Sequence, residues 1–177
     1  KDSRGILSGK RQLEERPKSA LERTRKGHFE IDLVHCNEHT DCILTLVDRK
    51  TRLTFIYKMD NKSKLEVSRV LVPAILNNSI RTISADNGTE WHGYEEIEKL
   101  TGCKFYFAKP YHSWERGTNE NTNGLIRQYL PKIKTMKGLT QDECDAIAKK
   151  LNRRPRKILN LSCPETCHFG TPLSLHF

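Results

Sequence analysis

The pattern of apolar and polar positions along the chain changes abruptly at His28. Residues 28–36 (HFEIDLVHC), 42–50 (CILTLVDRK) and 52–59 (RLTFIYKM) are short segments rich in β-branched and aromatic side chains. Such segments favour β-strands, and the tight polar turn between the last two favours an antiparallel meander. The pattern therefore predicts three consecutive strands.

Helical spacing of apolar residues begins after this meander. Residues 63–77 (SKLEVSRVLVPAILN) carry apolar side chains at helical spacing, with Ser63 as the N-cap and Glu66 three residues later. Pro73 is expected to bend this helix. Further along, the sequence predicts a strand over 80–88 that ends in a turn, a helix over 91–101 stopped by Gly102, a strand over 103–109, a helix over 118–130 ended by Pro131, and a helix over about 140–152.

This order of elements predicts an α/β domain. Three antiparallel strands followed by strands that alternate with helices are typical of the RNase H-like fold, in which a five-stranded mixed sheet carries helices on both faces. The 177 residues suffice for one such domain. We assign residues 28–159 to this core, 1–27 to a basic linker and 160–177 to a C-terminal tail.

The charge of the chain indicates a class of partner. A formal net charge of +9 predicts attraction to a polyanion, with nucleic acid the leading candidate and an anionic membrane surface the weaker one. Residues 1–27 carry nine Lys or Arg against four Asp or Glu, so they form either a mobile linker or a segment that contacts the DNA backbone. The sequence contains no apolar run of about eighteen residues and no signal core, so we expect a soluble, cytoplasmic protein without a membrane partner. Because it begins without methionine in a basic stretch, we expect a segment of a longer protein.

The cysteine and histidine residues do not form a convincing metal motif. The six cysteines show no repeated CxxC spacing and are interpreted as reduced thiols. Cys163, Cys167 and His168 resemble half a zinc site, but no second half occurs at a standard spacing. His28 and His35 fall on opposite faces of one strand and, with His39, are interpreted as non-ligands.

Two acidic residues lie on predicted strands. Asp32 is inside the apolar segment FEIDLV, where an unpaired carboxylate is costly; a structural salt bridge is the alternative explanation. Asp86 ends the strand IRTISA before Asn87 and Gly88, at the strand end where α/β sheets form their sites. A turn-forming aspartate that bonds its own backbone is the alternative there.

A third acid, Glu120, lies in the first turn of the helix over 118–130. At about 100° per residue it shares a face with Asn123, Gly124 and Arg127, whereas the apolar side chains fall on the opposite side. A solvated glutamate favoured by the helix dipole is the alternative. Glu115 precedes the expected helix and is the weaker candidate for a third ligand.

The three acids suit one kind of chemistry. Two divalent cations about 3.5–4 Å apart can activate an attacking oxygen and stabilise a leaving oxygen at phosphorus. Hard ions such as Mg²⁺ or Mn²⁺ prefer carboxylate oxygens, and converging carboxylates are tolerable when such ions are present. Asp32, Asp86 and Glu120 are therefore predicted to hold two metal ions, whereas pairing with Arg49 and Lys50 accounts for Asp48.

The sequence resembles the insertion-sequence transposases of the family named after insertion sequence thirty. The resemblance rests on GHFEIDLV, LTLVDRKTR, ADNGTEW, YHSWERGTNENTNGLIRQYLPK and LNRRPRKIL, and it spans roughly residues 10–160. It implies that Asp32, Asp86 and Glu120 are the metal-binding acids of a DDE motif, with 33 residues between the last two (87–119). It also implies that Arg127 contacts DNA near the active site.

The resemblance implies a DNA transposase core that frees a 3′-hydroxyl at a transposon end and joins it to target DNA, acting as a homo-oligomer on DNA. An RNase H-like nuclease that cuts without joining and an inactive DNA-binding remnant stay open as alternatives. His112 could contact phosphate and Trp114 could stack on an unpaired base, although core packing also explains Trp114. The full set of predicted DNA contacts is Arg127, Asn123, His112, Trp114, Lys150, Arg153, Arg154 and Arg156.

Overall fold

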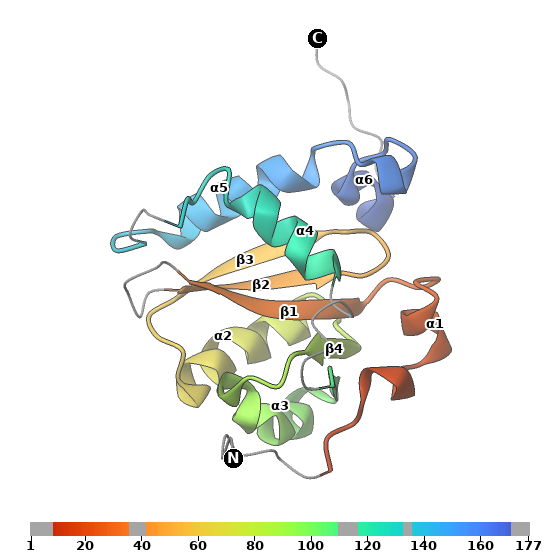
Figure 1. Cartoon of the computed structure of the whole chain (residues 1–177), viewed down its shortest axis with the longest axis vertical. Helices are drawn as coiled ribbons and strands as arrows, with labels where there is room; N and C mark the ends of the chain where they lie inside the picture. Colours follow the sequence, from red (N-terminus) through yellow and green to blue (C-terminus); the bar gives the residue numbers. More distant parts are fainter. Residues whose placement is uncertain (1–8, 36–41, 110–116, 133–135, 171–177) are drawn as a thin grey trace.

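The computed structural model describes residues 9–35, 42–109, 117–132 and 136–170. Its centre is a five-stranded mixed sheet in the order β3-β2-β1-β4-β5 (Figure 1). The strands are β1 (His28–His35), β2 (Cys42–Asp48), β3 (Thr54–Met59), β4 (Thr82–Ala85) and β5 (Lys104–Phe107). Strands β1, β2 and β3 pair antiparallel, whereas β4 is parallel to both β1 and β5. The predicted meander and the predicted mixed sheet are both confirmed.

Helices cover both faces of the sheet (Figure 1). One face carries α2 (Lys64–Asn77), the 3-10 helix η2 (Thr89–Gly93) and α3 (Tyr94–Thr101), and the other carries α4 (Gly117–Ile126) and α5 (Gln141–Asn152). The Ser63 hydroxyl accepts a hydrogen bond from the backbone N–H of Glu66, as its position predicts. Helix α2 continues through Pro73. Gly102 ends α3 with a φ of 72°, which an L side chain adopts only at a cost.

Alternation along each strand divides the core into two halves. Phe29, Ile31 and Leu33 of β1 belong to the apolar cluster that packs under α2 and α3. Val34 belongs to the cluster under α4 and α5. Because successive side chains of a strand point to opposite faces, the intervening Glu30 and Asp32 point to the same face as Val34. The polar side chains of β1 therefore face α4.

The N-terminal segment corrects one expectation. We expected no helix or strand pattern before residue 28, but a 3-10 helix η1 (Leu13–Glu15) and a short α1 (Lys18–Leu21) are present. Leu13 and Ala20 are buried, and Leu13 packs with Tyr106. Gln12 also forms an isolated parallel bridge with Phe107 of β5. These contacts hold the segment against the β5 side of the sheet, so a wholly unstructured linker is wrong for the described part of residues 1–27.

The C-terminal part differs from expectation in detail. Helix α4 ends at Ile126 rather than at Leu130, and only hydrogen-bonded turns follow it before Pro131. Thr140 caps α5 as one half of a capping box with Glu143. After a 3-10 turn η4 (Lys157–Leu159), a short α6 (Pro164–Phe169) lies within the segment predicted to be a tail. In the described ranges, no helix has the length and apolarity that a membrane crossing needs.

Candidate active site

Two of the three predicted acids lie on neighbouring strands of the sheet. The parallel register between β1 and β4 pairs His28 with Thr82 and Glu30 with Ser84. Asp32 and Asp86 each come two residues after the last of these pairs, so both lie at the same end of the two strands. The side chain of Asp32 points to the α4 face, whereas that of Asp86 bonds Trp91 of the apolar cluster under α2 and α3.

Asp32 is half-buried and is held by a side chain of α4. Its Oδ2 accepts a 2.6 Å hydrogen bond from Nδ2 of Asn123. This bond uses the Nδ2 atom of the amide and does not involve its Oδ1 atom. That oxygen is buried and has no hydrogen-bond partner among the residues that the structure describes. An oxygen acceptor without a donor, beside a carboxylate, suits a cation or a metal-bound water.

Asp86 follows β4 and organises the turn after it. Its Oδ1 accepts from the backbone N–H of Gly88 at 2.9 Å and from Nε1 of Trp91 at 2.6 Å. The first bond is the turn contact that formed the alternative explanation for this aspartate, so Asp86 does shape the turn. Trp91 is 1% exposed, and its indole can therefore hold the carboxylate in one orientation. The sequence offered no reason to assign this function to Trp91.

Glu120 lies on α4 with its side chain exposed. Asn123, the partner of Asp32, is three residues further on, and side chains at this spacing are neighbours on a helix, with Cβ atoms about 5–6 Å apart. Glu120 is therefore about one helical turn from the residue that bonds Asp32. Within the described residues, however, no three His, Cys, Asp or Glu side chains are close enough together to hold a metal ion. The structure places Asp32 and Asp86 at the same end of neighbouring strands and Glu120 on the helix that is bonded to Asp32.

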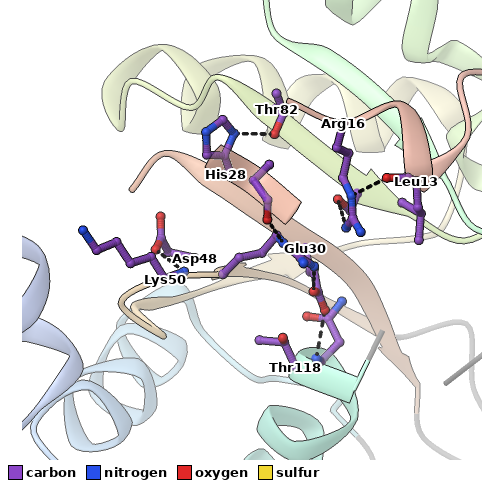
Figure 2. Close-up of polar contacts among 12 residues, drawn as sticks. Leu13, Arg16, His28, Glu30, Asp48, Lys50, Thr82 and Thr118 are labelled. Carbon is purple, nitrogen blue, oxygen red and sulfur yellow. Dashed lines mark hydrogen bonds and ion pairs between the residues drawn. The ribbon is translucent and has the colours of Figure 1, made fainter. Parts of the chain in front are cut away.

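A fourth acid, Glu30, anchors α4 to the sheet. It is completely buried and forms an ion pair with Arg49, which is itself 4% exposed. Its second oxygen accepts from the backbone N–H of Asn119 at 3.3 Å, and Nδ2 of Asn119 donates to the backbone oxygen of Ile31 at 3.0 Å. In Figure 2, Glu30, the acidic member of this ion pair, lies close to Thr118 at the start of α4. Strand alternation places Glu30 on the face of Asp32, but nothing in its sequence context distinguished it.

The N-terminal segment forms the other wall of the site. Lys10 extends its ammonium group to Oδ1 of Asn87 at 3.4 Å and lies over the ring of Phe107. Burial lowers the pKa of Lys10, and the charges of Asp86 and Glu90 oppose this change. Arg16 donates to the hydroxyl of Ser84 at 3.1 Å (Figure 2). A lysine beside Asp86 and an amide on Asp32 therefore offset the charge of two neighbouring carboxylates.

Most of the predicted DNA contacts are positioned by other side chains or by the backbone. Arg127 donates to the backbone oxygens of His35 and Leu130, which ties the end of α4 to the end of β1. Among the basic residues near α5, Lys150 lies over the ring of Tyr129, and Arg153 donates to the carboxylate of Glu165. Arg154 donates to the side chain of Gln128, and Arg156 donates to the backbone oxygen of Leu151. His112, Trp114 and Glu115 lie outside the described residues, as does His39.

Three residues set aside in the sequence have structural contacts. Asp48 is buried and accepts from the backbone N–H groups of Gly27, Lys50 and Thr51. The expected pairing with the side chains of Arg49 and Lys50 is wrong, because Arg49 pairs with Glu30. His28 bonds the hydroxyls of Ser19 and Thr82, and His168 bonds Thr51. The cysteines that the structure describes are free thiols.

The chain is similar to known proteins in both sequence and fold. No family model matches the chain. The chain is 45% identical over 163 residues to the transposase for insertion sequence element IS4351 of Bacteroides fragilis, covering 91% of this chain and 50% of that protein. It is 41% identical over 156 residues to transposase InsI for insertion sequence element IS30A of Escherichia coli, covering 86% of this chain and 40% of that protein. The chain thus spans half or less of the length of these relatives.

The fold matches solved structures of low sequence identity. The catalytic core domain of BIV integrase superposes with a TM-score of 0.62 at 17% identity, covering 81% of this chain and 94% of that domain. At this identity the likeness shows the fold alone, which is that of an integrase catalytic core, as the order of strands and helices predicts. With this fold, and with 41–45% identity to the two transposases over most of its length, the chain is a homologue of the IS30-family transposases.

Proposed function

We propose that this chain is the catalytic core of a DNA transposase, which cleaves DNA at transposon ends and transfers the freed 3′-hydroxyl into target DNA. The observation that carries the proposal is the placement of Asp32 and Asp86 at the same end of the paired strands β1 and β4, with α4, the helix of Glu120, bonded to Asp32 through Asn123. Similarity to the transposases over most of the chain supports a catalytic core, and the sequence motifs that carry the resemblance contain these three acids. The proposal includes action on DNA as a homo-oligomer.

The residues present fit divalent metal. Asp32, Asp86 and Glu120 provide hard oxygen donors, and the buried Oδ1 of Asn123 is a further acceptor beside them. Bound there, two Mg²⁺ or Mn²⁺ ions would activate the attacking oxygen and stabilise the leaving oxygen at phosphorus. In this assignment Asn123 and Trp91 orient the carboxylates of Asp32 and Asp86, and the Glu30–Arg49 pair positions α4.

The proposal is tested by cleavage and strand transfer on a labelled DNA duplex with Mg²⁺ or Mn²⁺, comparing the chain with Asp86→Asn. The variant keeps an oxygen for the Gly88 and Trp91 hydrogen bonds, so its fold should be nearly unchanged while joined products disappear. Glu96→Gln, an exposed acid on α3, is the matched control and should keep activity. Persistent metal-dependent cutting by Asp86→Asn would refute the assignment of the acids.

Two further results separate the alternatives. Cutting without joining would indicate a nuclease of the same fold. A chain that neither cuts nor takes up Mn²⁺ in calorimetry, while still binding DNA, would indicate an inactive remnant. Uptake of Mn²⁺ that is lost in Asp86→Asn would support the metal site even if cleavage needs parts of the longer relatives.

A further inference from the structure

A basic pocket lies on the side of α4 opposite Glu120. Its volume is about 370 Å³, and the first turn of α4 lines it through Thr118, Asn121 and Thr122. At about 100° per residue these three side chains share a face that is turned roughly half a circle from Glu120. The pocket is therefore separated from the candidate active site by about one helix diameter, ~10 Å.

Four cationic side chains from three parts of the chain meet in this pocket. Arg23 follows α1, Arg52 lies in the turn between β2 and β3, and Arg156 and Lys157 follow α5. No aspartate or glutamate belongs to its lining. Tertiary folding therefore gathers positive charge from distant segments, and the carboxylates that act on Arg52, Glu30 and Asp48, do not belong to the lining.

The lack of an acid partner distinguishes these cations from other arginines of the protein. Arg49 pairs with Glu30, and Arg11 pairs with Glu98. In the part of the chain that the structure describes, no ion pair joins any of the four pocket cations to a carboxylate. Arg52 donates instead to the hydroxyl of Thr118 at 2.6 Å. The Nε atom of Arg156 is buried and has no hydrogen-bond partner among the described residues.

Two observations indicate that this arrangement of cations destabilises the fold. Burial, followed by the charge of Arg23, lowers the pKa of Arg52 to about 10, while the charges of Glu30 and Asp48 oppose this change, so the cations repel one another while staying charged at neutral pH. Arg23 and Arg52 also have φ values of 56° and 64°. Residues other than glycine adopt such a backbone conformation only at a cost. The fold thus places two arginines in a strained conformation at one site lined by cations.

An anion would relieve both the repulsion and the unused donors. Planar guanidinium groups with free N–H donors match phosphate oxygens, and a phosphodiester carries one negative charge per nucleotide. We propose that the pocket binds a backbone phosphate of the DNA substrate that is not the reacting phosphate, through Arg23, Arg52, Arg156 and Lys157. This inference rests on the proposed function and adds a site to it, since the sequence offered Arg156 and the basic segments of Arg23 and Lys157 for DNA contact but no pocket that they share with Arg52.

The distance across α4, between the pocket and the three acids, indicates what a phosphate bound in the pocket would do. A phosphate held about 10 Å from the acids would fix the register of the duplex, in the way that backbone contacts position a protein without reading sequence. Loss of the pocket should then weaken binding to all DNA sequences alike. It should also reduce the salt dependence of binding, because one fewer phosphate is neutralised.

The test compares Arg23→Gln/Arg52→Gln with a control of equal charge, Lys62→Gln/Lys99→Gln, whose lysines are exposed at the start of α2 and on α3. Fluorescence anisotropy with a short labelled duplex gives affinity against salt. The pocket variant should bind about 10-fold more weakly and lose about one unit of the slope of log K against log salt. Its melting temperature should be unchanged or higher, because a repulsive pair has been removed.

The outcomes separate this inference from the proposed function. If the pocket variant binds like the control, the pocket assignment is overturned, whether or not the chain cuts DNA. A second outcome is a wild-type chain that cleaves no DNA but whose salt slope still differs from that of the pocket variant. That result would support the pocket assignment and contradict the proposed enzymatic function. If inorganic phosphate raises the melting temperature of the wild type but duplex binding is identical in both variants, the site holds a free anion and the DNA assignment is overturned.

Discussion

A hydrogen bond between Asn123 and Asp32 joins α4, the helix that carries Glu120, to strand β1, which carries Asp32. The 2.6 Å bond from Nδ2 of Asn123 to Oδ2 of Asp32 orients the carboxylate and sets the position of α4 along β1. Mutation of residues that orient metal ligands commonly lowers metal affinity by about 10- to 100-fold. The relationship makes Asn123 a positioning residue in the proposed site.

Asn123→Ala should therefore lower Mn²⁺ affinity and DNA cleavage by about 10- to 100-fold while the chain stays folded. Asn123→Asp tests the same contact with opposite consequences, because a second carboxylate beside Asp32 repels it without metal and adds a ligand with metal. Calorimetry with Mn²⁺ and melting curves with and without the ion measure both effects. Wild-type metal affinity in Asn123→Ala would contradict the positioning function.

Breaking the buried ion pair of Glu30 and Arg49 should damage the fold rather than the chemistry directly. Arg49→Leu leaves an uncompensated carboxylate at a fully buried position, which typically costs about 3–5 kcal/mol of the free energy of unfolding. Combining it with Glu30→Met removes both charges and should recover most of the loss. Urea unfolding of the three proteins gives the comparison. A loss of less than about 1 kcal/mol in Arg49→Leu would show that the pair is not needed to hold α4.

Gly124→Ala should stabilise the protein. Gly124 is exposed within α4, and an added Cβ would meet no atom within 4 Å. Alanine loses less backbone freedom on folding, so the free energy of unfolding should rise by about 0.5–1 kcal/mol. For a domain of this size that corresponds to a rise in melting temperature of roughly 1–4 °C. A lower melting temperature would mean that the helix backbone at this position is not as the structure describes.

His28 should make the fold sensitive to mild acid. Burial lowers the pKa of this histidine below its ordinary value, with the charge of Asp48 opposing the change and that of Arg81 adding to it. Below a pH of about 6.5 the unfolded chain takes up a proton that the folded chain resists. The contribution of His28 to the free energy of unfolding is thus complete above a pH of about 6.5 and is lost as the pH falls below it.

Stability measured by urea unfolding at neutral and mildly acidic pH tests this expectation. His28→Gln removes the titrating ring, so the fall in stability between the two pH values should be smaller than in the wild type. His168, whose pKa burial also lowers, should contribute a remaining part of the dependence. An identical pH dependence in wild type and His28→Gln would exclude His28 as its source.

The sequence by itself predicted the five strands and the main helices, and it placed the candidate acids Asp32 and Asp86 within one strand and at the end of another. Alternating β-branched segments predicted β1, β2 and β3, and the strand ending at Asp86 followed from its Asn-Gly turn, because these signals are local. The end of α4 at Ile126 and the helices within residues 9–27 were not predictable in this way. Their stability comes from contacts with distant residues, such as Leu13 with Tyr106.

Only the tertiary structure decided which charges meet. Three relationships depend on strand order and helix docking: the placement of Asp32 and Asp86 at one end of the paired strands, the Asn123 bond to Asp32 and the Trp91 bond to Asp86. The same holds for the basic pocket, whose arginines come from segments that share no local pattern. Periodicity fixes which face a side chain occupies, whereas packing of the whole chain fixes which neighbours share that face, since burying the apolar faces selects one arrangement of the elements.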